Sequence, residues 1–224
     1  TTEVNGLYEV VVGPMGSKIY YATADGRYLV TGDIIDLNTR ISLTQSRAQE
    51  LEMAYNDDRL KVLDTLGDDN MIAFGPDDAQ DTVTVITDVN CGYCRKLHRE
   101  MDQYNTEGIR VRYVLTDLFG GKDSRQKAEA VWCAEDRKDA LTKVKNREAI
   151  EMLTCEAPLD QQIAVGTEFG VTGTPAIVLP DGQLIRGYKP AKDLKALLDM
   201  KRLAQESLAS EMNGKPTEQP GSVQ

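Results

Sequence analysis

Two of the four cysteines, Cys91 and Cys94, stand three residues apart where a strand-like run gives way to a helix-like one. Thiols at this spacing on a helix have Cβ atoms about 5–6 Å apart, close enough to form a disulfide with little adjustment. A C-x-x-C motif between a strand and a helix is typical of a redox-active dithiol. A plain structural disulfide or a pair of buried thiols is the alternative interpretation.

The cysteine count also admits a metal site. Four-cysteine zinc sites usually carry two short pairs of ligands, whereas the second pair here, Cys133 and Cys155, is widely spaced. The single histidine, His98, does not replace the missing ligands. The spacing therefore favours two disulfide-capable pairs over zinc, and we expect no metal.

A helical wheel over residues 91–105 predicts that the two thiols differ in exposure. At about 100° per residue, Cys94 shares one arc with Leu97, Met101 and Tyr104, the expected buried face. Cys91 falls outside that arc, in the first turn, so we expect it to be exposed. The positive end of the helix should lower its pKa below the ordinary value of about 8.5. Cys94 should then resolve mixed disulfides.

Two further residues near the motif have open interpretations. His98 lies about 20° from Cys91 on the wheel but two turns away, a separation of about 11 Å. A cationic imidazole could help to hold a thiolate there, but a solvated helix residue is the favoured interpretation. In "VTGTPA" at 171–176, Pro175 precedes a strand-like run. X-Pro bonds are cis in only about 5–6 % of folded cases, so the proline alone does not predict a cis bond.

The N-terminal part of the sequence predicts a small sheet. Residues 7–41 are rich in Val, Ile and Tyr, and Asp25-Gly26 supplies a hairpin turn. A sheet this short seldom buries enough apolar surface to be stable alone. We therefore expect either a partner chain or packing against the rest of the same chain, and favour the partner. Residues 42–66 predict one kinked helix or two short ones, with Ser42 or Thr44 as the cap.

The second half of the chain alternates between strand and helix. A strand–helix–strand order over 71–115 predicts a parallel strand pair. Helix-forming residues follow at 123–169, then a β-hairpin from Ala176 to Tyr188 and a last helix from about Pro190. After about Leu208 the polar composition predicts a disordered tail.

The composition excludes some functions. The chain has 224 residues and a formal net charge of −10. Nucleic-acid binding needs clustered Lys and Arg, so we expect no nucleic-acid partner. No apolar run reaches the roughly 20 residues of a membrane-spanning helix.

Several motifs together resemble one family. Cys91-Gly92-Tyr93-Cys94, "VWCAED" at 131–136, "GVTGTPAIVL" at 170–179 and "GYKP" at 187–190 are similar to the DsbC/DsbG family of periplasmic thiol:disulfide interchange proteins. The resemblance implies an α+β or α/β architecture, in which a thioredoxin-like domain with a helical insertion is joined by a helical linker to a small, mainly β dimerisation domain. The expected bounds are 1–41 for the dimerisation domain, 42–69 for the linker, 70–206 for the catalytic domain with its insertion at about 122–160, and 207–224 for the disordered tail.

The resemblance also implies roles for individual residues. Cys91 would attack and Cys94 would resolve. The client chain would bind at Gly92, Tyr93 and a cis-proline loop at Thr174-Pro175, where the Thr174 backbone pairs with it as an added strand. Cys133 and Cys155 would form a structural disulfide in the insertion. No cofactor is expected beyond the redox-active Cys91–Cys94 pair.

The expected function is that of a disulfide isomerase. The resemblance implies a homodimer in the periplasm of a Gram-negative bacterium, misfolded disulfide-containing proteins as clients, and a membrane thiol reductase of the DsbD type as electron donor. Two alternatives remain at this stage. One is a DsbG-like reductase that protects single oxidised cysteines, and the other is a chaperone that uses the dimer cleft without redox chemistry.

Overall fold

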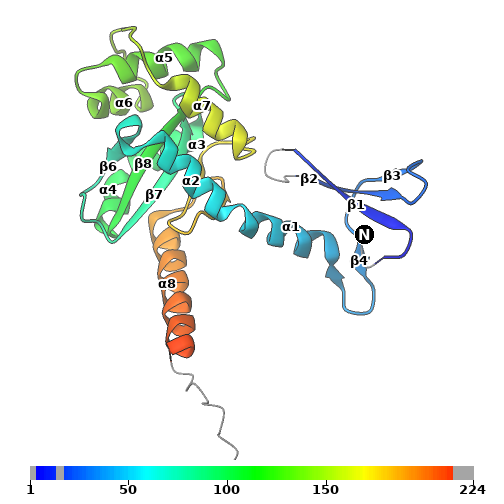
Figure 1. Cartoon of the computed structure of the whole chain (residues 1–224). Coiled ribbons are helices and arrows are strands. Elements are labelled where there is room, and N and C mark those ends of the chain that lie inside the picture. Colours follow the sequence, from blue (N-terminus) through cyan, green and yellow to red (C-terminus); the bar gives the residue numbers. More distant parts are fainter. Residues whose placement is uncertain (1–3, 14–17, 214–224) are drawn as a thin grey trace, which may run out of the picture.

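The computed structural model describes residues 4–13 and 18–213. Figure 1 shows a small sheet at the N-terminus, a helical arm and a larger α/β part, from which the last helix projects. Among the described residues, none of the helices combines the length and apolar character needed to cross a bilayer.

The N-terminal part consists of short antiparallel strands. β1 (Leu7–Val12), β2 (Lys18–Thr23) and β3 (Leu29–Val30) form a sheet in the order β1-β2-β3. β4 (Ile35–Asp36) and β5 (Ile41–Ser42) form a separate pair. With so few residues in strands, this part buries little of its apolar surface within itself.

The helical connection is two helices. α1 (Leu43–Ala54) begins at Ser42, whose side chain accepts a hydrogen bond from the Gln45 amide. α2 (Asn56–Leu66) follows directly after Tyr55 and ends at Gly67. A short 3₁₀ turn, η2 (Asp68–Asn70), leads into the α/β part. α1 has no buried residue, so it spans the gap without a core of its own.

The larger part is built on a five-stranded sheet in the order β10-β9-β7-β8-β6. Its strands are β6 (Ile72–Phe74), β7 (Asp81–Asp88), β8 (Ile109–Thr116), β9 (Ala176–Val178) and β10 (Leu184–Arg186). β7 and β8 are parallel, as the strand–helix–strand order predicts, and the other pairs are antiparallel. Residues 89–91 connect the carboxyl end of β7 to the helix that begins at Gly92.

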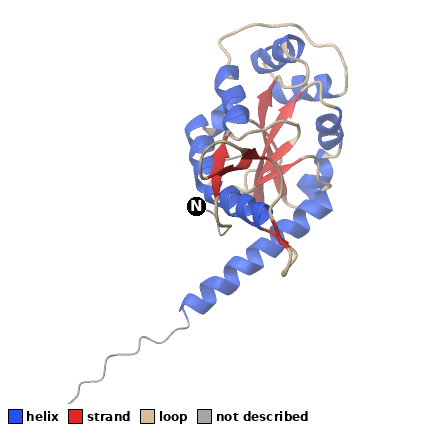
Figure 2. Cartoon of the chain, turned by 90° about the vertical axis from the view of Figure 1, so that its right-hand side faces the viewer, coloured by secondary structure: helices blue, strands red, loops and turns tan. Residues whose placement is uncertain are grey.

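Helices cover both faces of this sheet (Figure 2). They are α3 (Gly92–Arg99), α4 (Met101–Thr106), α5 (Lys122–Cys133), α6 (Arg137–Lys145), α7 (Leu159–Glu168) and α8 (Ala191–Asn213). Alternate residues of β8 face opposite cores, because side chains alternate along a strand. Tyr113 and Leu115 join one apolar cluster, while Val114 joins the other.

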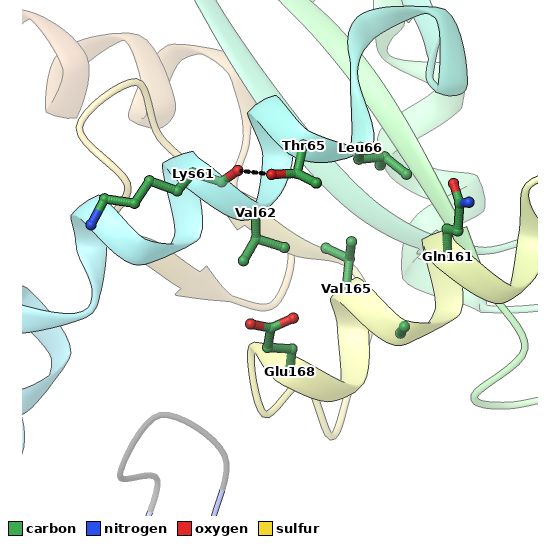
Figure 3. A pocket seen from close by; sticks show the side chains of 8 residues that line it. Lys61, Val62, Thr65, Leu66, Gln161, Val165 and Glu168 are labelled. Carbon is green, nitrogen blue, oxygen red and sulfur yellow. Dashed lines mark hydrogen bonds between the residues drawn. The ribbon is translucent and has the colours of Figure 1, made fainter.

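The predicted linker is partly a core element. Leu63 and Leu66 of α2 are buried in the same cluster as Val114 and Val165, so only α1 bridges the two parts of the chain. Between α2 and α7 the packing leaves a pocket of about 460 Å³, toward which Val62 and Val165 point (Figure 3).

The last helix extends further than the sequence predicts. α8 continues to Asn213, so the tail expected to be disordered from residue 207 begins as helix. Residues 214–224, the rest of that tail, lie outside the described residues.

Candidate active site

The Cys91–Cys94 pair lies at the junction of β7 and α3. Cys91 is the residue immediately before α3, with an extended backbone (φ −68°, ψ 128°), and Cys94 lies in the first turn. Leu97, Met101 and Tyr104 are buried together with Cys94, as the wheel predicts. The single helix expected over 91–105 is wrong, however, because the helix is interrupted at Glu100 and Met101 and Tyr104 belong to α4. Cys91 is less exposed than the wheel predicts. Its exposed fraction is 8 %, against 1 % for Cys94, because the 171–175 loop covers it.

The loop that covers Cys91 contains a cis peptide bond between Thr174 and Pro175. The Cys91 thiol donates to the carbonyl oxygen of Thr174 at 3.1 Å, across 83 positions of sequence. The Thr174 hydroxyl oxygen is buried and makes no hydrogen bond among the described residues, yet its interaction with the sulfurs favours the thiolate at both cysteines. The loop thus offers a spare donor to an anionic sulfur.

The two sulfurs differ in acidity. Hydrogen bonding from the Cys94 thiol lowers the pKa of Cys91 to about 5, helped by the Thr174 hydroxyl and the backbone N–H groups of Cys94 and Tyr93, although burial opposes the shift. Burial raises the pKa of Cys94, and its bond to Cys91 raises it further. Near neutral pH the pair therefore holds one thiolate, on the outer sulfur.

His98 contradicts the favoured interpretation of a solvated residue. It is buried, and its two ring nitrogens hydrogen-bond to the Tyr113 hydroxyl at 3.2 Å and the Thr142 hydroxyl at 3.1 Å. Burial lowers its pKa to about 4, with Lys145 contributing, so the imidazole is neutral and does not hold the thiolate. α6, which supplies Thr142, covers a helix face that a wheel of α3 alone treats as open.

The exposed rim of the site is aromatic. Tyr93 is 64 % exposed, and its ring stacks on that of Tyr188 with 6.4 Å between the centroids. The Lys96 ammonium sits 4.3 Å from the centroid of the Tyr188 ring. Gly92 is also exposed. Gly92 and Tyr93 thus lie beside Cys91 on an accessible surface, and Tyr188 adds an aromatic partner.

One buried cation was missed by the sequence interpretation. Lys145, at the end of α6, is fully buried behind the cysteine pair, and its Nζ donates to the Thr87 hydroxyl at 2.6 Å. Its burial has no signal in the sequence, because a lysine at a helix C-terminus is normally solvated and interacts with the helix dipole.

The other two cysteines form a disulfide. Cys133 and Cys155 are bonded across a sequence separation of 22, with Cα atoms 5.7 Å apart, while Cys91 and Cys94 are free thiols. The four cysteines therefore fall into two pairs. Within residues 4–13 and 18–213, no group of three or more His, Cys, Asp or Glu side chains could hold a metal ion.

Comparison with known protein families finds two matches along the chain. Residues 68–201 match the thioredoxin-like domain, and residues 1–45 match the disulfide bond isomerase protein N-terminal domain. These two matches correspond to the two parts of the structure on either side of the α1 arm.

Individual relatives agree with the family matches. Thiol:disulfide interchange protein DsbC of Escherichia coli K12 is 34 % identical over 82 % of this chain and 74 % of its own length. The protein of the same name from Haemophilus influenzae is 32 % identical over 80 % of this chain and 75 % of its own. A solved disulfide interchange protein from Neisseria gonorrhoeae is 26 % identical, covers 60 % of this chain and 96 % of its own, and has a TM-score of 0.54. The chain therefore belongs to the DsbC family of thiol:disulfide interchange proteins and is a thiol-disulfide oxidoreductase of the isomerase type.

Proposed function

We propose that this protein rearranges non-native disulfides in secreted proteins through a mixed disulfide at Cys91. The observation that carries the proposal is the position of the Cys91 sulfur, between the N-terminus of α3 and the Thr174-Pro175 loop, where hydrogen bonds lower its pKa to about 5. A thiolate is the attacking species in disulfide exchange. Cys94, held protonated one turn further in, resolves the mixed disulfide when the client does not.

Client binding is proposed at the surface around Cys91. An extended client segment pairs with the backbone of Thr174, a mode that depends little on client sequence. The carbonyl oxygen of Thr174 lies 3.1 Å from the Cys91 sulfur. Gly92 leaves room for the client chain, and the exposed ring of Tyr93 gives it an apolar contact.

Reactivation of scrambled ribonuclease by the reduced protein tests the proposal. Wild type should restore ribonuclease activity, whereas Cys91→Ser should not. Cys94→Ser keeps the attacking sulfur but cannot resolve, so it should accumulate a covalent complex with the client. Recovery with Cys91→Ser equal to wild type would refute the proposal. If Cys91→Ser still suppressed client aggregation, the chaperone alternative would gain support, and preferential reduction of sulfenylated single cysteines would support the DsbG-like one.

We also infer that the chain forms a homodimer through its N-terminal part. Many large apolar side chains there are exposed, which is unusual for a surface without a partner. They include Tyr28, Leu29, Val30, Ile35, Leu37 and Ile41. Sedimentation of a Leu29→Glu, Val30→Glu variant should show dissociation to monomers, whereas Leu203→Glu, at a similarly exposed position on α8, should remain dimeric. A monomeric wild type would contradict the inference.

A periplasmic location in a Gram-negative bacterium follows from the redox states that the function needs. The Cys133–Cys155 bond requires an oxidising compartment, while isomerisation requires Cys91 and Cys94 to be reduced. A membrane reductase of the DsbD type would keep the pair reduced in such a compartment. Loss of this reductase should leave the Cys91–Cys94 pair oxidised, as trapping of free thiols in whole cells would report.

A further inference from the structure

Lys145 is a buried cation without a carboxylate partner. Its side chain is fully buried, and its Nζ donates to the Thr87 hydroxyl at 2.6 Å and to the backbone carbonyl of Asp88 at 2.9 Å. None of the ion pairs among the described residues includes it. A buried ammonium is unfavourable unless a negative charge compensates it. Burial accordingly lowers the pKa of Lys145 to about 8.

The Asp88 carboxylate and the Cys91 thiolate act on Lys145 electrostatically, but among the described residues neither accepts a hydrogen bond from its Nζ. The carboxylate of Asp88 is occupied by the amides of Asn90 and Phe119 and by the Ser124 hydroxyl. The sulfur of Cys94, in contrast, lies within the field of Lys145 and in hydrogen-bonding contact with Thr87. Both of these contacts favour a thiolate at Cys94, against the burial that raises its pKa.

The direction of the hydrogen bonds allows Lys145 to stabilise a Cys94 thiolate through Thr87. A lysine ammonium has no acceptor, so the Thr87 oxygen accepts from Lys145 and its own proton remains available for the sulfur of Cys94. The three groups form a chain that ends inside the protein. Thr87 has no exposed surface, so bulk water does not offer a competing donor at that position.

We propose that Lys145, acting through Thr87, is the positioning residue that allows Cys94 to ionise when it resolves the mixed disulfide. The inference rests on the proposed function and adds the residue that assists the resolving attack by Cys94. The step starts from the neutral amine of Lys145, a form that its pKa of about 8 makes accessible near neutral pH. Cys94 passes its proton to the Thr87 oxygen, and Thr87 passes its own to Lys145, which becomes the ammonium that donates to Thr87. The Cys94 thiolate attacks the Cys91 sulfur, a Cys91–Cys94 bond forms, and the client sulfur leaves as a thiolate. The cysteine pair loses two electrons, the client disulfide gains them, and Lys145 later releases the proton to solvent.

Among the titratable groups around Lys145, the cysteines are those whose charge changes during the reaction. His98 is neutral near pH 7, because burial lowers its pKa to about 4. Tyr113, whose ring centroid is 5.8 Å from Nζ, is also neutral, because burial raises its pKa. The charged or titratable groups that act on Lys145 from α3 and the end of β7 are Cys94, Asp88, Cys91 and Arg95.

A chromogenic disulfide separates the two steps in one experiment. Reduced full-length protein is mixed with dithiobis(nitrobenzoic acid) in a stopped-flow instrument. The attack of Cys91 releases one coloured thiolate, and the attack of Cys94 on the resulting mixed disulfide releases the second. The variants are Lys145→Met, Thr87→Val and Thr87→Ser. Lys143→Met, which removes an exposed lysine of the same helix, is the control.

The proposal predicts that only the second phase changes. In Lys145→Met the second phase at pH 7 should slow about tenfold to a hundredfold, the loss expected for one hydrogen bond to a charged group, and its pH midpoint should rise. Thr87→Val should behave alike, Thr87→Ser should retain the wild-type rate, and Lys143→Met should match wild type. An unchanged second phase in Lys145→Met, or an equal slowing of both phases, would overturn the role of Lys145. If wild type released only the first thiolate, the resolving step and the role of Lys145 would be refuted, whereas release of neither thiolate would refute the proposed function itself.

Discussion

Cys94 is the neighbour that lowers the pKa of Cys91 most, so its replacement tests the electrostatics of the site. Cys94→Ala removes a hydrogen bond to a charged sulfur, which contributes about 1.5–3 kcal/mol. At about 1.4 kcal/mol per pKa unit, the pKa of Cys91 should rise from about 5 by about one to two units. Cys94→Ser retains a donor at the same position, so it should shift the pKa less and serves as the matched control.

The assay must read the midpoint rather than the rate at neutral pH. With a pKa of about 5 instead of 9.0, Cys91 has about a hundredfold more thiolate at pH 7 than an ordinary cysteine. A less basic thiolate is also less nucleophilic, by about 40- to 100-fold over this range for a Brønsted slope of about 0.4–0.5. The two effects nearly cancel at pH 7, whereas at pH 5 Cys91 should react about 50- to 100-fold faster than the ordinary thiol.

The measurement is the pH dependence of the first exchange phase with a small disulfide, with thiolate absorbance in the ultraviolet as a second signal. A cysteine peptide of ordinary pKa is measured in parallel. Wild type should have its midpoint near pH 5, and Cys94→Ala should have it at a higher pH. A wild-type midpoint above pH 8, or an identical midpoint in Cys94→Ala, would refute the account of the thiolate given above.

Three further predictions concern stability, each measured by unfolding in urea. Gly182→Ala should lower the free energy of unfolding by about 1–3 kcal/mol or more, because its Cβ would lie 2.1 Å from a backbone oxygen of α2. Gly26→Ala is the control, since Gly26 also has a positive φ but lies in open space, and its loss should be smaller. Equal losses in the two variants would point to backbone strain alone. Replacing Cys133 and Cys155 by Ala should cost about 3 kcal/mol for a loop of this length, and no loss would contradict the chain-entropy estimate. The pKa of His98 is about 4 in the folded protein against an ordinary value of 6.5, so the unfolded chain binds a proton that the folded chain does not. The free energy of unfolding should therefore fall by about 3 kcal/mol as the pH falls from 7 to 4. The same pH dependence in His98→Asn would exclude His98 as its source.

The sequence predicted those parts of the site that depend on local periodicity. The helical wheel placed Cys94 and Leu97 on the buried face of α3, because helix geometry decides which residues share an arc. Met101 and Tyr104 are buried as predicted, but from the separate helix α4. The parallel pairing of β7 with β8 followed from the order of elements for a similar reason.

The errors arose where a distant segment decides the environment. Cys91 is less exposed than the wheel implies because the Thr174-Pro175 loop, 83 positions away, covers it. His98 and Lys145 are buried by contacts between α3, α6 and the end of β7. Neither side chain has an apolar pattern around it that would predict burial, so only the tertiary packing identifies them.

The arm between the two parts of the chain has a geometric consequence of its own. α2 is fixed in the core through Leu63 and Leu66, and Arg59 binds both Glu52 of α1 and the Gly182 carbonyl. α1 itself buries none of its residues, so a change in its length would not open a buried core. Each residue inserted there would turn the N-terminal sheet by about 100° and move it by about 1.5 Å along the helix axis. In a dimer, the number of residues in α1 would thus set the orientation of one catalytic face relative to the other, although α1 takes no part in the chemistry.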